Sequence, residues 1–314
     1  MELIDRVAHR LKLRDLRLLD TVVRLRSMAK AAHRLNISQP AVSKAIAELE
    51  HVFAVRLVVR NRQGIEPTEY GRALLDCGLA VFDDLRLGVK NIEFLADPTA
   101  GEVRIGCNPF LAPAFVSAVV DRVTRRFPRI VVHVVIPQAE IIYQELSERK
   151  VDFLITRIWG PPLEHPFDFE FLFEDSFVVV AGARNPWVRR RRIELAELMN
   201  EPWVLPTPEG PLGQLTMEAF RACGLDHPRT SVVSPTPEVR LSLLATGRFL
   251  SIFPTSSLRF PTRRPELKAL PVELPMARVP NGIISLKNRA LSPVAQLFIE
   301  HAREVARTRA KGKW

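Results

Sequence analysis

Polar side chains at the start of one predicted helix are of the types that read the edges of DNA bases. They lie within residues 27–50, SMAKAAHRLNISQPAVSKAIAELE. Glutamine makes paired contacts to adenine, lysine reaches guanine or phosphate, and serine is a short, versatile donor. The free N–H groups at the start of a helix also attract phosphate. The residues in this position are Ser38, Gln39, Pro40, Ser43 and Lys44.

Two arginines, Arg60 and Arg62, follow in a segment that predicts two short strands around a turn at residues 61–64. Arginines on such a hairpin suit contacts to the DNA backbone. Residues 1–66 hold 13 Lys and Arg against 7 Asp and Glu, while the whole chain has a net charge of +10. A basic head on a nearly neutral body suggests a polyanionic partner. A solvated basic surface without a ligand fits the charge equally well.

Capping residues define the helices that position these side chains. Ser27 and Ser38 are predicted N-caps of two helices joined by a turn at Asn36-Ile37, and Pro40 sits in the first turn of the second helix. An apolar stripe on the second helix is expected to face the core: Val42, Ile46, Leu49 and Phe53.

The head resembles the DNA-binding signature of LysR-type transcriptional regulators. The residues that carry the resemblance are Ala31-Ala32, Ser38-Gln39-Pro40-Ala41-Val42-Ser43, Leu49-Glu50 and Pro67-Thr68-Glu69-Tyr70-Gly71. The resemblance implies a winged helix-turn-helix that binds double-stranded promoter DNA through the five residues named above, with Arg60 in the wing. Met28 and Ala29 depart from the pattern, since an aromatic and a hydroxyl residue are common there.

A long helix is predicted from Thr68 to about Ala96. Apolar and glycine positions spaced alternately by four and three residues form a coiled-coil seam. These positions are Leu74, Gly78, Val81, Leu85, Gly88, Ile92 and Leu95. The seam predicts a dimerisation helix; the alternative is a long helix packed on its own domain. Residues 97–101, DPTAG, are expected to end the helix as a hinge.

Strands and helices alternate from residue 102 onward, which favours an α/β fold with a parallel sheet. With the resemblance, the fold class is α+β followed by α/β, the latter a two-lobed effector domain similar to type 2 periplasmic binding proteins. The expected divisions are 1–67 for DNA binding, 68–97 for the linker helix and 98–314 for the effector domain. Within it, lobe I covers about 101–180 and 274–314, and lobe II about 181–273.

Ligands of open α/β sheets bind at the carboxyl ends of the strands. The polar residues expected there are Asn108, Gln138, Thr156 and Arg157 in lobe I, and Thr207 and Thr236 in lobe II. Each could instead be a turn residue satisfied by local backbone, and Arg157 could form a surface salt bridge. The effector class stays open among sugars, aromatic acids and aliphatic acids. The run 189–192 is interpreted as solvated surface.

The sequence contains no catalytic signature, phosphate-binding glycine loop or metal cluster, so neither an enzyme nor a cofactor is expected. Three separated cysteines, and the lack of a secretory signal or of about 18 consecutive apolar residues, predict a cytoplasmic protein with no membrane contact. The resemblance implies a homotetramer built as a dimer of dimers, and RNA polymerase is a further candidate partner. The rival interpretation is a small-molecule binding protein or enzyme of the same two-lobed fold, whose N-terminal domain only oligomerises.

Overall fold

A computed structural model of the protein describes residues 7, 10–138, 141–159, 166–259 and 266–310. The chain forms two compact units, Met1–Val89 and Lys90–Trp314, each with its own hydrophobic core. The expected order of a helical head and an α/β body is confirmed. The boundary between the units falls inside the long helix α5 (Glu69–Ala96), so the segment expected as a separate linker belongs in part to each unit.

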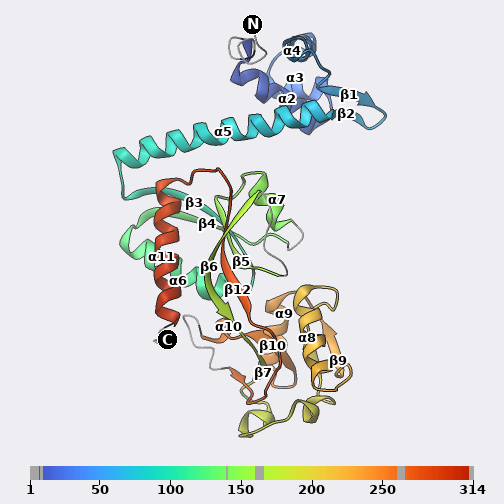
Figure 1. Ribbon diagram of the computed structural model, residues 1–314, viewed down its shortest axis with the longest axis vertical. Helices are drawn as coiled ribbons and strands as arrows, with labels where there is room; N and C mark the ends of the chain where they lie inside the picture. The colour runs from blue at the N-terminus through green and yellow to red at the C-terminus, as the bar shows by residue number, and fades with distance from the viewer. Residues whose placement is uncertain (1–6, 8–9, 139–140, 160–165, 260–265, 311–314) are drawn as a thin grey trace. The chain divides into compact units, whose positions relative to one another are not determined.

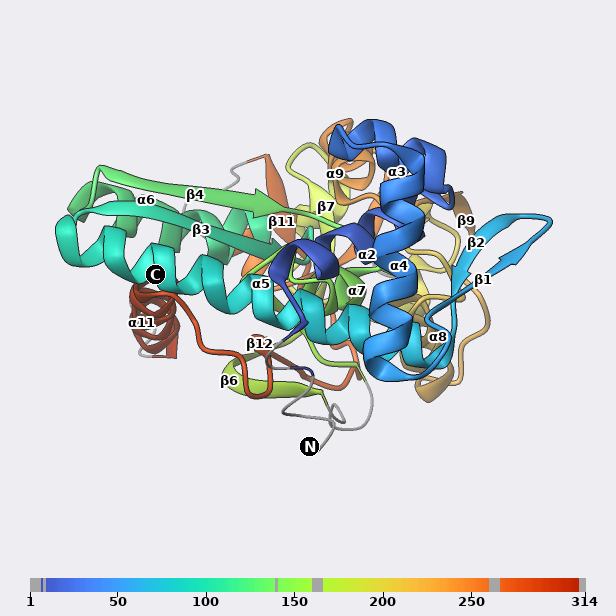
Figure 2. The same ribbon diagram turned by 90° about the horizontal axis from the view of Figure 1, so that it is seen from above.

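Within residues 11–89, the first unit contains short helices, a hairpin and most of α5. The elements are α2 (Leu13–Leu25), α3 (Met28–Leu35), α4 (Gln39–Phe53), β1 (Val58–Asn61) and β2 (Gly64–Pro67). Both predicted N-caps are confirmed: Ser27 Oγ accepts from the Lys30 N–H and Ser38 Oγ from the Ala41 N–H, each at 3.3 Å. The antiparallel β1–β2 hairpin projects away from the helices as a two-stranded wing (Figures 1 and 2).

One backbone contact fixes the base of the wing. The Ile65 N–H donates to the Arg26 carbonyl at 3.1 Å, next to Gly64, whose φ is +117°. A Cβ on Gly64 would lie 2.6 Å from that carbonyl oxygen, so glycine is required both by the dihedral and by the close approach. The wing is thereby tied to the end of α2.

The predicted seam along α5 has two different environments. Leu74 is buried in the core of the first unit, and a Cβ on Gly78 would contact Leu16 of α2. At these two positions the helix packs within its own unit, as in the alternative interpretation, and the dimer contact stays a prediction for the rest of the seam. Ile92 and Leu95, in contrast, are 69% and 81% exposed. The apolar repeat therefore begins inside the first unit, at Leu74 and Gly78, and continues at the exposed positions Ile92 and Leu95.

The first sheet of the second unit defines lobe I. Its strands, in spatial order, are β4 (Arg129–Val135), β3 (Ala100–Cys107), β5 (Phe153–Arg157), β12 (Val279–Leu286) and β6 (Phe167–Asp175). β3 pairs in parallel with β4 and β5, but β12 runs antiparallel to both β5 and β6. The sheet is mixed rather than parallel, because the chain returns to it from the second lobe in β12.

Helices cover both faces of this sheet. The π-helical turn η1 (Ala112–Val116), α6 (Ser117–Arg126) and α11 (Pro293–Ala310) contribute to one core, whereas α7 (Ile142–Ser147) contributes to a separate cluster with β5 and β12 (Figure 1). The layering is that of an α/β domain.

The second sheet defines lobe II. Its strands, in spatial order, are β11 (Leu267–Ala269), β7 (Phe177–Gly182), β10 (Leu250–Pro254), β8 (Trp203–Leu205) and β9 (Thr230–Val233). Its helices are η2 (Pro186–Arg189), η3 (Leu195–Leu198), α8 (Pro211–Ala222), α9 (Pro237–Ala245) and α10 (Ser256–Arg259). Because β7 pairs with β10, the chain leaves lobe I at Ser176 rather than at the expected residue 180. No helix in the described part of the chain has the length and hydrophobicity of a membrane span.

Candidate nucleic-acid interface and ligand cleft

The start of α4 presents the predicted base-reading residues to solvent. Ser38, Gln39, Pro40 and Lys44 are exposed and Ser43 is half-buried, while the opposite face of the helix packs in the core. Lys44 Nζ lies 3.8 Å from the Glu48 carboxylate, but both side chains are largely exposed, so this pair leaves the ammonium available.

A hollow of about 260 Å³ links this helix to the wing. Gln39 and Arg60 lie on its wall together with Asn61 and the first residues of α3. Arg62 is exposed on the wing but does not line the hollow. Ala29 does line it, at the position where the LysR resemblance favours a hydroxyl. The fold therefore brings a base-reading amide, a wing guanidinium and the N-terminus of α3 onto one surface.

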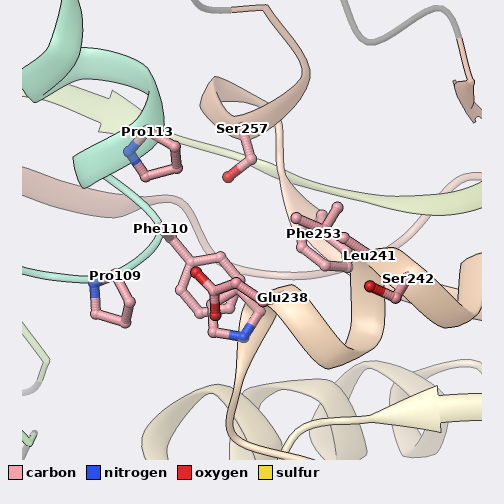
Figure 3. Close-up of a pocket in the computed structure, with 9 residues that line it drawn as sticks. Pro109, Phe110, Pro113, Glu238, Leu241, Ser242, Phe253 and Ser257 are labelled. Atoms are coloured by element: carbon pink, nitrogen blue, oxygen red, sulfur yellow. The ribbon is translucent and has the colours of Figure 1, made fainter.

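A second hollow of about 260 Å³ lies between the lobes (Figure 3). Lobe I contributes two prolines and a phenylalanine from the turn after β3, and lobe II contributes residues of α9, β10 and α10. The lining residues are Pro109, Phe110, Pro113, Pro237, Glu238, Leu241, Ser242, Phe253 and Ser257. The cleft is mostly apolar, with one carboxylate and two hydroxyls.

None of the six predicted effector residues lines this cleft. Asn108 Oδ1 accepts from the Phe110 N–H at 2.8 Å, as a turn residue does. Gln138 and Thr236 are exposed, Thr207 is half-buried and Thr156 is buried. The chain turns at Asn108 and at Thr236, and the residues that follow each turn line the hollow, so effector contacts by the six residues stay a prediction.

Arg157 forms a buried ion pair rather than a surface one. Its guanidinium lies 3.4 Å from the Asp175 carboxylate, and the two side chains are 1% and 0% exposed. Asp175 also accepts from the Thr255 hydroxyl at 2.9 Å, from the Ser256 N–H at 3.1 Å and from the Ser256 hydroxyl. The pair joins the ends of β5 and β6 to the segment after β10, and so occupies the junction of the lobes.

Arg240 on α9 is a second buried arginine, one that sequence reasoning missed. Its Nε and Nη2 donate to Ser251 Oγ at 3.1 and 2.8 Å, and Nη2 also donates to the Ile252 carbonyl. The guanidinium carbon lies 4.5 Å from the centroid of the Phe253 ring and 5.7 Å from that of Phe110. Burial lowers the pKa of Arg240 to about 9. No local pattern distinguishes Arg240 from a solvated arginine in the sequence.

The described residues include possible metal ligands and three cysteines, which differ in exposure. They contain no group of three or more His, Cys, Asp or Glu side chains that could hold a metal ion. Cys107 is buried at the end of β3, which raises the pKa of its thiol to about 12, while Cys77 and Cys223 are exposed free thiols.

Comparison with known protein families matches both units of the chain. Residues 13–72 match the family described as "Bacterial regulatory helix-turn-helix protein, lysR family", and residues 96–307 match the "LysR substrate binding domain". The chain belongs to the LysR family. It is a transcriptional regulator with a DNA-binding head and an effector-binding domain, and not an enzyme.

The relatives align with nearly the whole length of this chain. The regulator GbpR of Azospirillum brasilense is 27% identical over 304 residues, which cover 96% of this chain and 89% of that protein. The regulator TdcA of Escherichia coli K12 is 27% identical over 287 residues, covering 90% and 89%. Full-length CbnR, solved in complex with its target DNA, has the same fold with a TM-score of 0.62 at 21% identity, covering 94% of this chain and 100% of that one.

Proposed function

We propose that this regulator reads its operator with the start of α4 and contacts the DNA backbone through the wing. The observation that carries the proposal is the hollow in which Gln39 and Arg60 face the same space as the N-terminus of α3. Side-chain amides specify bases, whereas guanidinium groups and helix N-termini hold phosphates. Ser38, Pro40, Ser43 and Lys44 complete the α4 contribution, and Arg62 adds charge to the wing.

The proposed control of DNA binding lies in the cleft between the lobes. A small effector bound there changes lobe closure, and the change passes to the spacing of the DNA-binding heads in an oligomer. The exposed C-terminal part of α5 is the proposed dimer contact, and two dimers form the homotetramer. RNA polymerase is the partner proposed for the DNA-bound tetramer, and the cytoplasm is its proposed location.

The proposal is tested by isolating genomic DNA fragments that co-purify with the full chain and measuring their binding at several salt concentrations. A specific operator should bind with a logarithmic affinity that falls linearly with the logarithm of salt concentration, because phosphate contacts release counterions. It should also bind at least about 10³-fold more tightly than unrelated DNA. Equal binding to all fragments, or no binding at low salt, would favour the rival small-molecule binding protein.

A further inference from the structure

The guanidinium of Arg240 is buried without a full set of hydrogen bonds. The side chain is 0% exposed, and Nη1 has no hydrogen-bond partner among the described residues. Nε and Nη2 are bonded only to neutral acceptors, Ser251 Oγ and the Ile252 carbonyl. A buried charge is costly unless it is paired and hydrogen-bonded. An incompletely satisfied cation of this kind is a candidate anion-binding group.

The Arg240 guanidinium packs against two aromatic rings of the cleft between the lobes. These are the rings of Phe110 and Phe253, and both residues line the cleft. Arg157 also lies over the Phe110 ring, at 5.3 Å, so one phenylalanine contacts two buried guanidinium groups. Figure 3 shows the Phe110 ring beside the cleft-lining residues of α9. Movement of this ring would open Arg240 to a ligand.

A second unsatisfied donor belongs to the same cleft. Ser257 lines it, and the Ser257 hydroxyl oxygen is shielded from solvent with no hydrogen-bond partner among the described residues. Buried hydroxyls are nearly always hydrogen-bonded in native structures. Ser257 is on α10 and Arg240 on α9, so two separate elements bring unpaired donors to the surroundings of one hollow.

We propose that the effector is a monocarboxylic acid with an apolar body, whose carboxylate displaces the Phe110 ring and binds Arg240 Nη1 and the Ser257 hydroxyl. This inference rests on the proposed function of the cleft. Arginine has donors and no acceptor, so it suits a carboxylate better than a sugar hydroxyl, which must also donate. The apolar body would lie on Phe253, Leu241 and Pro113.

Glu238 restricts the acid further. Glu238 lines the same cleft as Phe110 and is one of the residues labelled in Figure 3. A second negative charge on the ligand would be repelled there, whereas a hydroxyl or ammonium group would be accepted as a hydrogen-bond donor. The cleft therefore favours a monoacid over a diacid.

The test compares benzoate with benzamide, which has nearly the same shape but no charge. Thermal unfolding of the full chain is followed with benzoate, 4-hydroxybenzoate, cyclohexanecarboxylate, benzamide, phthalate and galactose, each against sodium chloride of equal ionic strength. At least one monoacid should raise Tm in proportion to the logarithm of its concentration, and its neutral or doubly charged counterparts should not. Calorimetric titration then gives the Kd for that acid.

Arg240→Gln should weaken binding of that acid by about ten-fold or more, because a charge-assisted hydrogen bond is lost. Arg240→Lys should restore part of the affinity. Arg248→Gln is the matched control, since Arg248 is exposed on lobe II and stacks on Phe249. If Arg240→Gln does not fold, Ser257→Ala provides the second variant and should weaken binding of the same acid several-fold.

The inference would be overturned if no monoacid stabilised the chain beyond chloride, if benzamide or phthalate stabilised it as much as the best monoacid, or if acid binding survived both Arg240→Gln and Ser257→Ala. Galactose binding that does not change in Arg240→Gln would also overturn it, while supporting the cleft as a ligand site. Operator binding is measured separately and without effector. If no acid binds as proposed, the proposed DNA-binding function is unaffected. A failure of operator binding would be detected in the separate measurement.

Discussion

At the scale of single residues, the base contacts proposed for α4 and the phosphate contact proposed for the wing can be tested separately. Gln39 is exposed and lines the hollow beside the wing, while Ser43 is half-buried. Gln39→Ala or Ser43→Ala should weaken operator binding by about 1–3 kcal/mol for each lost base contact, and should relax specificity at that base. Competition binding against operator variants measures both effects. Gln214→Ala is the matched control, because the Gln214 side chain is exposed on α8 of lobe II.

Arg60 should act differently, because its predicted contact is to phosphate. Arg60→Ala is expected to weaken binding to operator and to unrelated DNA alike, and to lower the salt slope by roughly one unit. Arg221→Ala, at an exposed site on α8, should leave the slope unchanged. A loss confined to the operator would instead make Arg60 a base-reading residue.

Burial makes a clear prediction about the three cysteines. The pKa of the Cys107 thiol is raised to about 12, and the thiolate is the reactive form. In the folded protein at about pH 8, iodoacetamide should modify the exposed Cys77 and Cys223 and leave Cys107 unmodified, as read by peptide mass spectrometry. In urea all three should react. Rapid native modification of Cys107 would show that β3 opens locally.

Residues with a local role were predictable, and residues defined by tertiary contacts were not. The caps Ser27 and Ser38 follow from a serine placed before a helical stripe, since the cap bond joins residues three apart. Asp175 accepts from residues 80 and 81 positions away, and Arg240 gains its role only by burial behind Phe110. Neither has a sequence pattern of its own.

At the scale of elements, α5 combines an intramolecular contact with an uncovered apolar stripe. Leu85 and Ile92 are 48% and 69% exposed, whereas Leu74 is buried against the first unit. Leu85→Asp or Ile92→Asp should shift the full chain to smaller species in analytical ultracentrifugation, because an unpaired charge in an apolar seam is strongly unfavourable. Binding to an operator with two half-sites should weaken in parallel.

Leu74→Asp provides the contrasting variant. It should lower the stability of the DNA-binding unit, by about 2–5 kcal/mol, since it places a charge in the core rather than in a partner contact. An unchanged sedimentation profile for Leu85→Asp and Ile92→Asp would mean that another surface holds the oligomer together.

Sequence reasoning missed the strands β6 and β11, although the sequence of β6 carries a signal. β6, FDFEFLFED, alternates phenylalanine with acidic residues over its first four positions, which is the period of a half-buried strand. Its antiparallel place beside β12 could not be predicted, because the partner lies more than 100 residues later. The mixed sheet of lobe I therefore followed from the pairing of distant segments rather than from local pattern.

At the scale of the whole second unit, the point where the chain passes from lobe I to lobe II, at Ser176, is paired with the segment that follows β10. The Thr255 N–H donates to the Ser176 carbonyl at 2.8 Å, and the two hydroxyls lie 3.0 Å apart. The Asp175 carboxylate holds this junction from the lobe I side through Arg157, Thr255 and Ser256. The proposed lobe closure would take place around this buried charge pair.

Removing that carboxylate should destabilise the second unit more than any surface substitution. Asp175→Ala removes the carboxylate that pairs with the buried Arg157 guanidinium. Breaking such a pair lowers the free energy of unfolding by about 3–5 kcal/mol. Asp175→Asn keeps an acceptor for the Ser256 N–H and should cost less. Asp168→Asn is the matched control, because Asp168 is 60% exposed and its ion pair with Lys287 spans 3.9 Å.

Urea unfolding followed by tryptophan fluorescence measures this effect directly, since all four tryptophans lie between residues 159 and 314 and report on the second unit alone. The expected order of stability is wild type and Asp168→Asn, then Asp175→Asn, then Asp175→Ala. If Asp175→Ala were as stable as the control, the pair would add nothing to the junction. The hinge for effector-driven closure would then have to rest on the backbone pairing of Ser176 with Thr255 rather than on charge.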